Sequence, residues 1–286
     1  MRTRPTAWWL EALRKRRARM DGEVLDLGRP IAFESHEEQR AAVAFFNAAF
    51  RAEESGLRQA HELAGEVRRW DPELAECLAL YGDEEGWHRE LLTKFLAWLG
   101  GTVRPMGRTT RTFYRLYGRA KRMESIVLVN LMFETIGSTT YRLALRKAAH
   151  PAVRQMLTIL TRDESFHVPL NVHFLRQALA RAQGNARRRL RALYHATFLG
   201  LIASTAPSRR RAERFDHIPR RDLARAYAEQ LARLFLEEND LGIEPSPLLL
   251  GAFRLDRSAL LRAPSSISLE AAERATDRED VAVTAM

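Results

Sequence analysis

The sequence predicts an all-α protein, and three observations carry this prediction. Apolar residues recur every three or four positions across residues 35–184, which is the spacing of one face of a helix. Residues that favour helix ends stand at the borders of these periodic segments. No stretch shows the alternation of a half-buried strand or the turn of a hairpin. With 286 residues, 46% of them apolar, the chain can bury a sizeable core.

The first two long helices are predicted over 35–67 and 72–99. Ser35 and Glu38 form the capping-box pattern that opens the first helix. Asp71 is the expected N-cap of the second helix, a proline follows at the first helical position, and a Gly-Gly pair ends it. These two helices are expected to form a helical hairpin.

A second pair of long helices follows a loop that contains glycine and proline. The third helix is predicted over about 121–148, and the fourth begins at Pro151 and ends near Gly184. Two further amphipathic helices are expected at about 186–204 and 220–238, with the basic loop APSRRRAERFDHIP between them.

The chain is therefore expected to have three parts. They are a basic N-terminal arm (1–34), a helical domain (35–240) and a C-terminal extension (241–286). Within the domain a core bundle covers 35–184 and extra helices cover 186–238. The extension turns polar and acidic from about residue 264, which predicts disorder there.

The arm contains AWWLEALRKRRARM, which predicts a short amphipathic helix. Trp8, Trp9 and Leu13 lie on its apolar side. This side is expected to pack onto the helical domain, and a helix lying on a membrane surface is the alternative.

The composition and the apolar runs of the chain indicate in which cellular compartment the protein is expected. A single cysteine, Cys77, excludes a disulfide framework within the chain and favours a reducing, cytoplasmic setting. The start of the chain lacks the apolar run of a signal peptide. The longest apolar run, residues 126–133, is far shorter than the ~20 residues that span a bilayer.

The net charge of +10 predicts an acidic partner, such as nucleic acid, an anionic membrane face or an acidic carrier protein. Only four of the 46 basic residues are lysines, however, and such a skew also arises from genomic base composition. Solvated surface arginine is therefore the simpler interpretation.

One four-residue pattern occurs twice, in DEEGWHREL and in RDESFHVPL. In each copy a Glu is followed three residues later by a His, which gives the pairs Glu85/His88 and Glu164/His167. A Glu and a His at this spacing share one face of a helix. Each pair continues the apolar stripe of its helix, so charged residues stand at positions that should be buried.

The other two long helices also carry acids in their apolar faces. Glu134 stands alone in NLMFETIGSTTY, and Glu53 and Glu54 stand together in the first helix. The lone Glu precedes the Glu of the following motif by 31 residues in the first hairpin, counted from Glu54, and by 30 in the second. Each hairpin therefore brings one Glu and one Glu-x-x-His to the core.

Burying carboxylates without a compensating positive charge is costly, and a metal ion supplies that charge. Four carboxylates and two imidazoles offer hard oxygen donors for two metal ions and one imidazole for each. The sequence therefore predicts a di-iron or di-manganese carboxylate site.

This pattern resembles the ferritin-like di-iron carboxylate superfamily over about residues 35–184. The superfamily includes ferritins, rubrerythrins, acyl-carrier desaturases, deformylating oxygenases and arylamine N-oxygenases. The resemblance implies a ferritin-like four-helix bundle with two iron ions, or a manganese–iron pair as an alternative. The metal ligands that it implies are Glu54, Glu85, His88, Glu134, Glu164 and His167.

The resemblance also implies that the acid before each motif Glu accepts the second ring N–H of the histidine on the opposite helix. Asp163 is thereby expected behind His88, and Glu84 behind His167. These acids would hold the two rings in a fixed orientation.

The residues two turns after the lone glutamates are expected beside the site. Tyr141 lies seven residues after Glu134, and His61 lies seven residues after Glu54. This parallel favours Glu54 as the ligand from the first helix, with Glu53 as the alternative.

A hydroxyl is also expected near the site. Ser138 and Thr139 stand about one turn after Glu134, where many hydroxylating relatives carry a hydroxyl near the O2 pocket. Ser138 is therefore the candidate catalytic residue, and back-bonding to a helix carbonyl is the alternative role.

Three comparisons within the superfamily narrow the reaction. The chain has Leu92 where ribonucleotide reductase relatives carry a Tyr, and Leu160 where arylamine N-oxygenases carry a third His. Extra helices after residue 184 fit a ferritin shell poorly. The remaining expectation is a non-haem di-iron oxidase or oxygenase that activates O2 and oxidises a largely apolar or carrier-tethered organic substrate.

The expected partners are a small organic substrate, which an acidic carrier protein could present, and an external electron donor. A metal-binding protein without turnover is one alternative, and a homodimer is left open. A nucleic-acid-modifying hydroxylase, similar to the tRNA hydroxylase of the superfamily, is another alternative. Its phosphate contacts would come from arginines at 187–189 and 209–211 and from Arg108, Arg111, Arg115 and Arg119.

Overall fold

The computed structural model of the chain describes residues 4–106, 111 and 121–262. The described residues form helices and no strand, so the all-α prediction is confirmed. The disorder expected from about residue 264 lies outside the described residues. No helix in the described part of the chain is both long enough and apolar enough to cross a membrane.

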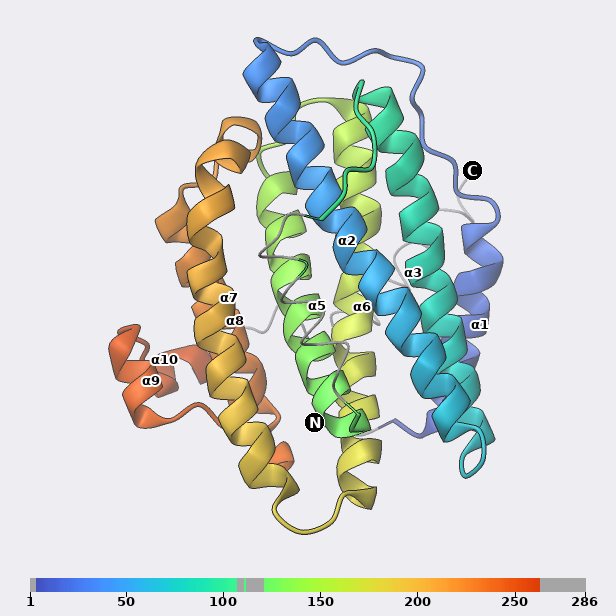
Figure 1. Cartoon of the computed structure of the whole chain (residues 1–286), viewed down its shortest axis with the longest axis vertical. Helices are drawn as coiled ribbons and strands as arrows, with labels where there is room; N and C mark the ends of the chain where they lie inside the picture. Colours follow the sequence, from blue (N-terminus) through green and yellow to red (C-terminus); the bar gives the residue numbers. More distant parts are fainter. Residues whose placement is uncertain (1–3, 107–110, 112–120, 263–286) are drawn as a thin grey trace.

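Four long helices lie side by side and form the central bundle (Figure 1). They are α2 (His36–Val67), α3 (Pro72–Trp98), α5 (Met123–Leu145) and α6 (Pro151–Arg181). α2 packs along α3 and α5 packs along α6, so the bundle consists of two hairpins. The predicted boundaries of these helices agree with the structure to within three residues.

Side-chain caps explain where the first two helices of the bundle begin. The Ser35 hydroxyl accepts a hydrogen bond from the backbone N–H of Glu38, and the Asp71 carboxylate accepts one from the backbone N–H of Leu74. These contacts satisfy donors that the first turn of a helix leaves without partners.

The apolar core of the bundle is divided into two clusters. In α2, the buried apolar residues within 42–50 belong to one cluster and those within 60–67 belong to the other. The other three helices show the same division, with interruptions at 82–90, 133–140 and 161–165. A layer across the middle of the bundle is therefore left for polar side chains.

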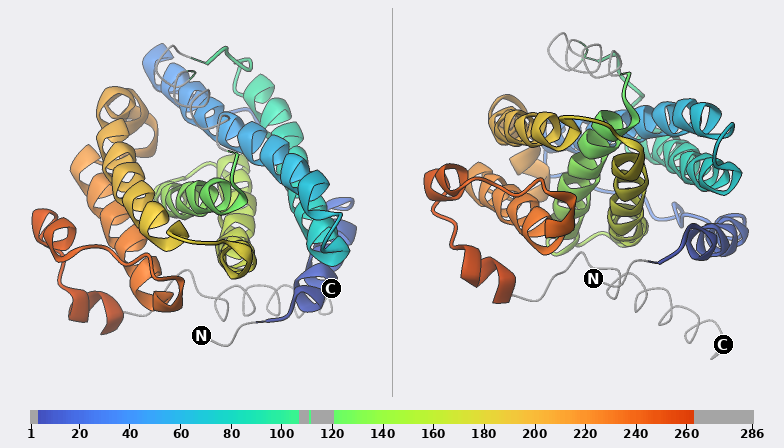
Figure 2. Two further views of the ribbon diagram at one scale, coloured as in Figure 1. Left: turned by 60° about the horizontal axis from the view of Figure 1, so that its bottom comes forward. Right: turned by 90° about the horizontal axis from the view of Figure 1, so that it is seen from below.

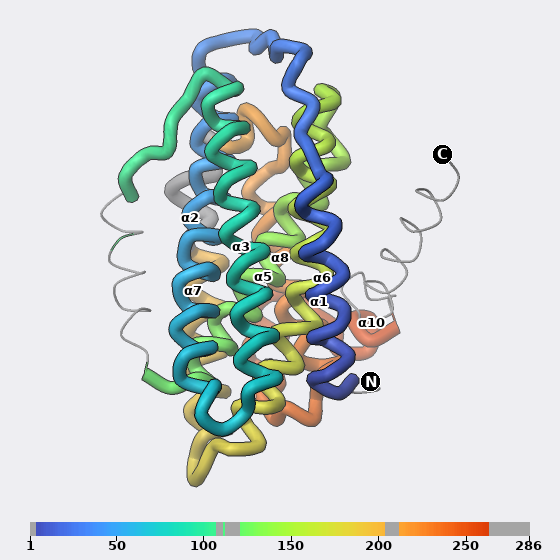
Figure 3. The backbone as a smooth tube through the Cα atoms, turned by 90° about the vertical axis from the view of Figure 1, so that its right-hand side faces the viewer, coloured from blue at the N-terminus to red at the C-terminus, as the bar shows by residue number. Residues whose placement is uncertain are grey.

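α1 (Thr6–Met20) lies against α3 on the outside of the bundle (Figure 3). Its residues Trp9, Leu10 and Leu13 are buried. The indole ring of Trp9 meets the ring of Phe166 edge-on, with 5.5 Å between the centroids. The apolar side of the arm helix thus packs onto the bundle, as expected.

α7 (Ala186–Asp216) and α8 (Arg220–Glu237) pack beside α5 on the side of the bundle away from α1, and α7 also contacts α2 (Figure 2). The prediction of a basic loop before Pro219 is largely wrong, because α7 continues to Asp216. Phe215 packs against the rings of Phe45 and Phe46 at 5.4 and 5.6 Å. This tertiary contact stabilises the last turns of α7 as helix, which the local sequence alone does not predict.

The described part of the C-terminal extension continues this side layer. It begins at the end of η1 (Asn239–Leu241) and contains α9 (Pro247–Ala252) and α10 (Arg257–Arg262). Leu249, Leu250 and Leu260 of these short helices are buried. Apolar contacts therefore hold the extension to the rest of the chain at least as far as α10.

Candidate metal centre

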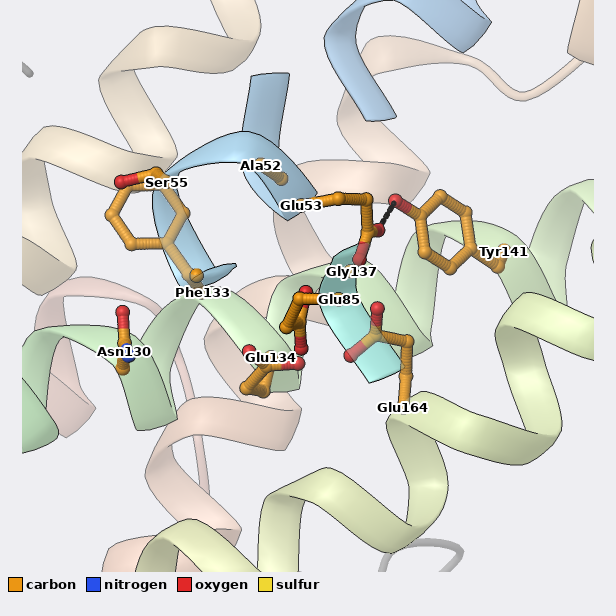
Figure 4. Close-up of a pocket in the computed structure, with 11 residues that line it drawn as sticks. Ala52, Glu53, Ser55, Glu85, Asn130, Phe133, Glu134, Gly137, Tyr141 and Glu164 are labelled. Carbon is orange, nitrogen blue, oxygen red and sulfur yellow. Dashed lines mark hydrogen bonds between the residues drawn. The ribbon is translucent and has the colours of Figure 1, made fainter. Parts of the chain in front are cut away.

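The polar layer holds six carboxylate and imidazole side chains, which come from all four helices of the bundle. α2 supplies Glu53, α3 supplies Glu85 and His88, α5 supplies Glu134, and α6 supplies Glu164 and His167. None of the six is more than 8% exposed. Figure 4 shows the four carboxylates pointing toward one another from different helices as part of the lining of a pocket.

The six side chains form two groups of three. One group is Glu53, His88 and Glu164, and the other is Glu85, Glu134 and His167. Within each group the ligand atoms lie within 4.8 Å of one another. Each group combines a lone Glu, a motif His and the motif Glu of the opposite hairpin, so the two sequence motifs are interleaved in space.

The choice of Glu54 over Glu53 is wrong, because α2 turns Glu53 into the layer. Glu53 lies seven residues after Phe46 and seven before Ala60, and all three are at most 1% exposed. Glu54 is 36% exposed at its side chain and pairs with Arg51 on the same helix. The supporting parallel fails as well, since His61 is 44% exposed and faces Asp83.

Among the six ligand side chains, three buried polar atoms lack hydrogen-bond partners: Oε1 of Glu85, Oε2 of Glu164 and Nδ1 of His167. Nδ1 of His167 lies 3.1 Å from Oε1 of Glu85, but the two do not form a hydrogen bond of acceptable geometry. Buried polar atoms without partners are rare, and each needs an explanation such as a bound ion. All three belong to residues of the two groups, so the donor set fits metal ions.

The carboxylates of the layer differ in their pKa values. Burial, followed by repulsion from Glu53 and Glu134, raises the pKa of Glu85 well above its usual value. Burial and the same two neighbours also raise the pKa of Glu164. Burial opposes the ionisation of Glu53 too, but the hydrogen bond with His88 keeps its pKa below the usual value. Without metal, therefore, two of the four carboxylates favour the protonated form.

The remaining ligand groups are held in their charged forms. Burial opposes the ionisation of Glu134, yet its interactions with Glu164 and with the nearby ring of His167 lower its pKa to about 2. Burial also opposes protonation of His88, but Asp163 and Glu53 accept hydrogen bonds from its ring and raise its pKa to about 10. The pKa of His167 is likewise raised well above its usual value, because four surrounding glutamates outweigh the effect of burial.

Each histidine directs one ring nitrogen into the layer and the other toward an acid behind it. Nε2 of His88 lies 3.1 Å from Oδ2 of Asp163, and Nε2 of His167 lies 2.8 Å from Oε2 of Glu84. Both contacts have the partners that the resemblance implies. A carboxylate behind a ring fixes its orientation and leaves Nδ1 as the nitrogen that faces the other ligands.

Arginines stand behind both of these acids, which the sequence interpretation missed. Nε of Arg16 donates to Oε1 of Glu84 at 2.8 Å, and a terminal nitrogen donates to Oδ1 of Asp163 at 2.7 Å. Arg162 also donates to Asp163 and to Glu23. The sequence does contain a signal for Arg16, because this residue follows Trp9 by seven positions and so lies on the apolar side of α1. A charged residue on an apolar helix face is the same signal that identified the motif glutamates of α3 and α6.

Two tyrosines donate hydrogen bonds to ligand carboxylates. The Tyr81 hydroxyl donates to Oε1 of Glu134 at 2.6 Å, and the Tyr141 hydroxyl donates to Oε1 of Glu53 at 3.4 Å. Tyr141 thus lies beside the layer, as expected, although its partner is on α2. Tyr81 also sets its ring edge-on to the ring of His167, with 4.8 Å between the centroids.

The structure does not place Ser138 at the pocket. The Ser138 hydroxyl accepts a hydrogen bond from Arg142 and lies 3.4 Å from the hydroxyl of Ser165 on α6. Gly137, the preceding residue on α5, lines the pocket instead. Thr139 bonds the carbonyl of Thr135, so for this residue the back-bonding alternative holds. A catalytic role for Ser138 has no support in this arrangement.

The pocket lies between α2 and α5 and opens on the carboxylate side of the layer (Figure 4). Small residues make room for it, since Ala52 and Gly56 line it from α2 and Gly137 lines it from α5. Phe133, Ser55 and Asn130 line the end away from Tyr141 in Figure 4. Neither histidine lines the pocket, so a molecule entering it would meet the carboxylates first.

The arginines suggested as a phosphate-binding surface are only partly described. Arg108, Arg115, Arg119 and the side chains of residues 209–211 lie outside the described residues. Arg111 is exposed and donates to the carbonyl of Met106, and Arg189 pairs with Glu124.

No protein-family model and no curated protein matches this chain.

Proposed function

We propose that this chain is a member of the ferritin-like di-iron carboxylate superfamily that holds two iron ions and oxidises an organic substrate with O2. The observation that supports the proposal most is the pair of interleaved Glu, Glu, His groups in one buried layer. Three atoms of these groups lack partners, which a bound cation would provide. The pocket at the carboxylate side leaves a small space beside them, enough for a molecule of the size of water or O2.

We propose iron as the bound metal. Four carboxylates are hard ligands, and each group adds one imidazole, a combination typical of di-iron and di-manganese carboxylate sites. Two bound iron(II) ions would supply the electrons for the reduction of O2, and manganese in one position is the alternative. Glu53, His88 and Glu164 would hold one ion, and the other group would hold the second.

Two features of the chain prepare the ligands for such chemistry. Asp163 and Glu84 keep each histidine oriented with Nδ1 toward the ions. Tyr81 holds Oε1 of Glu134 by a hydrogen bond, while Oε2 faces Nδ1 of His167 at 3.7 Å. The geometry of the ligands therefore exists before a metal arrives, which reduces reorganisation during a reaction.

The surroundings suit an organic substrate. Apolar clusters close the layer from above and below, and they keep water from the reacting groups. The small residues of the pocket leave space next to Glu53 and Glu134. A largely apolar substrate, free or tethered to an acidic carrier, is the class that we propose.

The proposal is tested by loading the metal-free protein with iron(II) under anaerobic conditions, measuring the metal content, and then mixing the protein with O2. We expect two iron ions per chain and a rapid uptake of O2 that is close to stoichiometric with the sites. The variant Glu53→Gln should lose this uptake, whereas Glu54→Gln should keep it, because only Glu53 lies in the layer.

Three outcomes separate the alternatives. Two bound metals without O2 uptake would leave a metal-binding protein and remove the oxidase. Oxidation of many irons per chain with retention of a mineral would instead indicate storage. O2 uptake that is accelerated only by RNA would favour the nucleic-acid-modifying alternative.

A further inference from the structure

A single guanidinium lies between the acids behind the two histidines. Arg16 belongs to α1, which is outside the four-helix bundle, and only 5% of it is exposed. Its Nε and one terminal nitrogen donate to Glu84 at 2.8 and 3.2 Å, and the same terminal nitrogen donates to Asp163 at 2.7 Å. Glu84 is on α3 and Asp163 is on α6, so Arg16 joins both hairpins through one side chain.

The acids that Arg16 contacts are those that hold the two imidazoles. Glu84 contacts Nε2 of His167, and Asp163 contacts Nε2 of His88. Each histidine belongs to a different metal-binding group. Arg16 therefore reaches both metal-binding groups, through Glu84 to His167 and through Asp163 to His88.

Burial of this arginine needs a reason beyond surface solvation. Its neighbours on α1, Arg14 and Arg17, are more than half exposed at their side chains and pair with Glu76 and Asp83 at the surface. Arg16 instead stacks over the ring of Phe166 with 4.2 Å between its guanidinium carbon and the ring centroid. Burying a charge is costly, and a buried ion network is weak evidence for a contribution to stability alone.

We propose that Arg16 is a positioning residue shared by both metal groups. It fixes the two acids, and through them it sets the orientation and the donor strength of His88 and His167 together. This inference rests on the metal binding proposed above, but it does not depend on the reaction with O2.

The physical basis is competition for the lone pairs of the acids. A guanidinium that binds Glu84 and Asp163 draws electron density from their oxygens, so they accept more weakly from the imidazole N–H groups. Removing Arg16 should strengthen both N–H contacts and make both imidazoles stronger donors to a metal.

Arg162 provides an internal comparison. It donates to Asp163, which contacts His88, and to Glu23. Its removal should therefore act on His88 alone. Arg14, on the same helix as Arg16 but paired with the exposed Glu76, should act on neither histidine.

The experiment uses the full-length chain loaded with cobalt(II), a paramagnetic ion that shifts the proton signals of its histidine ligands. In the unsubstituted protein we expect two strongly shifted signals that disappear in D2O, one for the Nε2–H of each histidine. Arg16→Gln should move both signals, Arg162→Gln should move one, and Arg14→Gln should move none. Helix content and thermal midpoints are recorded for each variant to verify the fold.

Arg16→Lys keeps the positive charge, and it replaces Arg16→Gln in the experiment if the glutamine variant does not fold. An ammonium lacks the planar fork that spans both acids, so both signals should still move, but by less. The inference is overturned if either folded Arg16 variant leaves one or both signals in place. If the unsubstituted protein binds fewer than two cobalt ions per chain, the proposed metal binding fails, and this inference fails with it.

Discussion

Oε2 of Glu53 lies 3.1 Å from Nδ1 of His88, and neither side chain is more than 1% exposed. This contact joins α2 to α3 inside the polar layer. It also identifies the carboxylate that α2 contributes, since the adjacent Glu54 pairs with Arg51 and is 36% exposed at its side chain. The first prediction follows from this difference between neighbouring residues.

Glu53→Ala should reduce the metal content to about one ion per chain, because it removes one of three donors from one group. Glu54→Ala should leave the content at two, since it removes only a contact near the surface. Metal analysis after anaerobic loading and desalting measures both. Equal losses in the two variants would show that the layer does not bind metal through Glu53.

Gly56→Ala should displace the side chain of Glu85 and weaken metal binding. A Cβ at this position would lie 2.9 Å from Oε2 of Glu85 and 3.0 Å from its carboxyl carbon. Gly65 on the same helix is the matched control, because an added Cβ there meets nothing within 4 Å. Gly65→Ala should keep the metal and stabilise the protein by about 0.5–1 kcal/mol, the usual gain in a helix.

Binding titrations and urea unfolding of the two glycine variants check this pair. Unchanged metal affinity in Gly56→Ala would mean that Glu85 can move aside without loss, so that its position in the layer is not a requirement for binding.

Tyr81→Phe should destabilise the metal-free protein more than Tyr141→Phe. The Tyr81 hydroxyl donates at 2.6 Å to a carboxylate that is held in its charged form, and such a bond contributes about 1.5–3 kcal/mol. The Tyr141 contact is longer, 3.4 Å, and should contribute no more than about 1 kcal/mol. Denaturant unfolding of both variants gives the comparison, and the reverse order would contradict the arrangement of α5 against α3.

Metal binding should strengthen as the pH rises, because protons occupy the ligands of the metal-free protein. The pKa of His88 is raised to about 10, and those of His167, Glu85 and Glu164 are raised as well. Raised values mean that the protonated forms stabilise the metal-free fold below the unfolded-state pKa values. That stability is lost as the pH rises through the folded-state values, and a metal can then take the place of the protons.

The number of protons released can be measured. At pH 7 loading with two divalent ions should release roughly two to four protons, one from each histidine and up to one each from Glu85 and Glu164. Calorimetric titrations in two buffers with different ionisation enthalpies count these protons. Release of none, or weaker binding at higher pH, would contradict the protonation states described for the layer.

Much of the fold and most of the site follow from periodicity. The long helices and their starts follow from apolar spacing and from caps such as Ser35 and Asp71, because both act within a few residues of the chain. The glutamates and histidines of the two motifs are recognisable because they interrupt apolar stripes. A charged residue within an apolar stripe is buried in any fold, and its charge then needs an opposite charge or a metal ion beside it.

Three features depend on packing between helices, and the sequence interpretation missed them. Glu53 and Glu54 differ by 100° around the helix, and only the heptad from Phe46 through Glu53 to Ala60 shows which one is buried. Ser138 faces Ser165 on α6 rather than the pocket, which depends on the rotation of α5. The sequence places Arg16 on the apolar side of α1, but its partners Glu84 and Asp163 follow only from the docking of α1 on the bundle.

The most direct test of the two-metal centre is anomalous diffraction from crystals of the full-length protein grown with iron under anaerobic conditions. We expect two peaks at the iron absorption edge in each chain. One should lie among Glu53, His88 and Glu164, and the other among Glu85, Glu134 and His167. A single peak, or peaks away from this layer, would contradict the two-metal centre on which the proposed function depends.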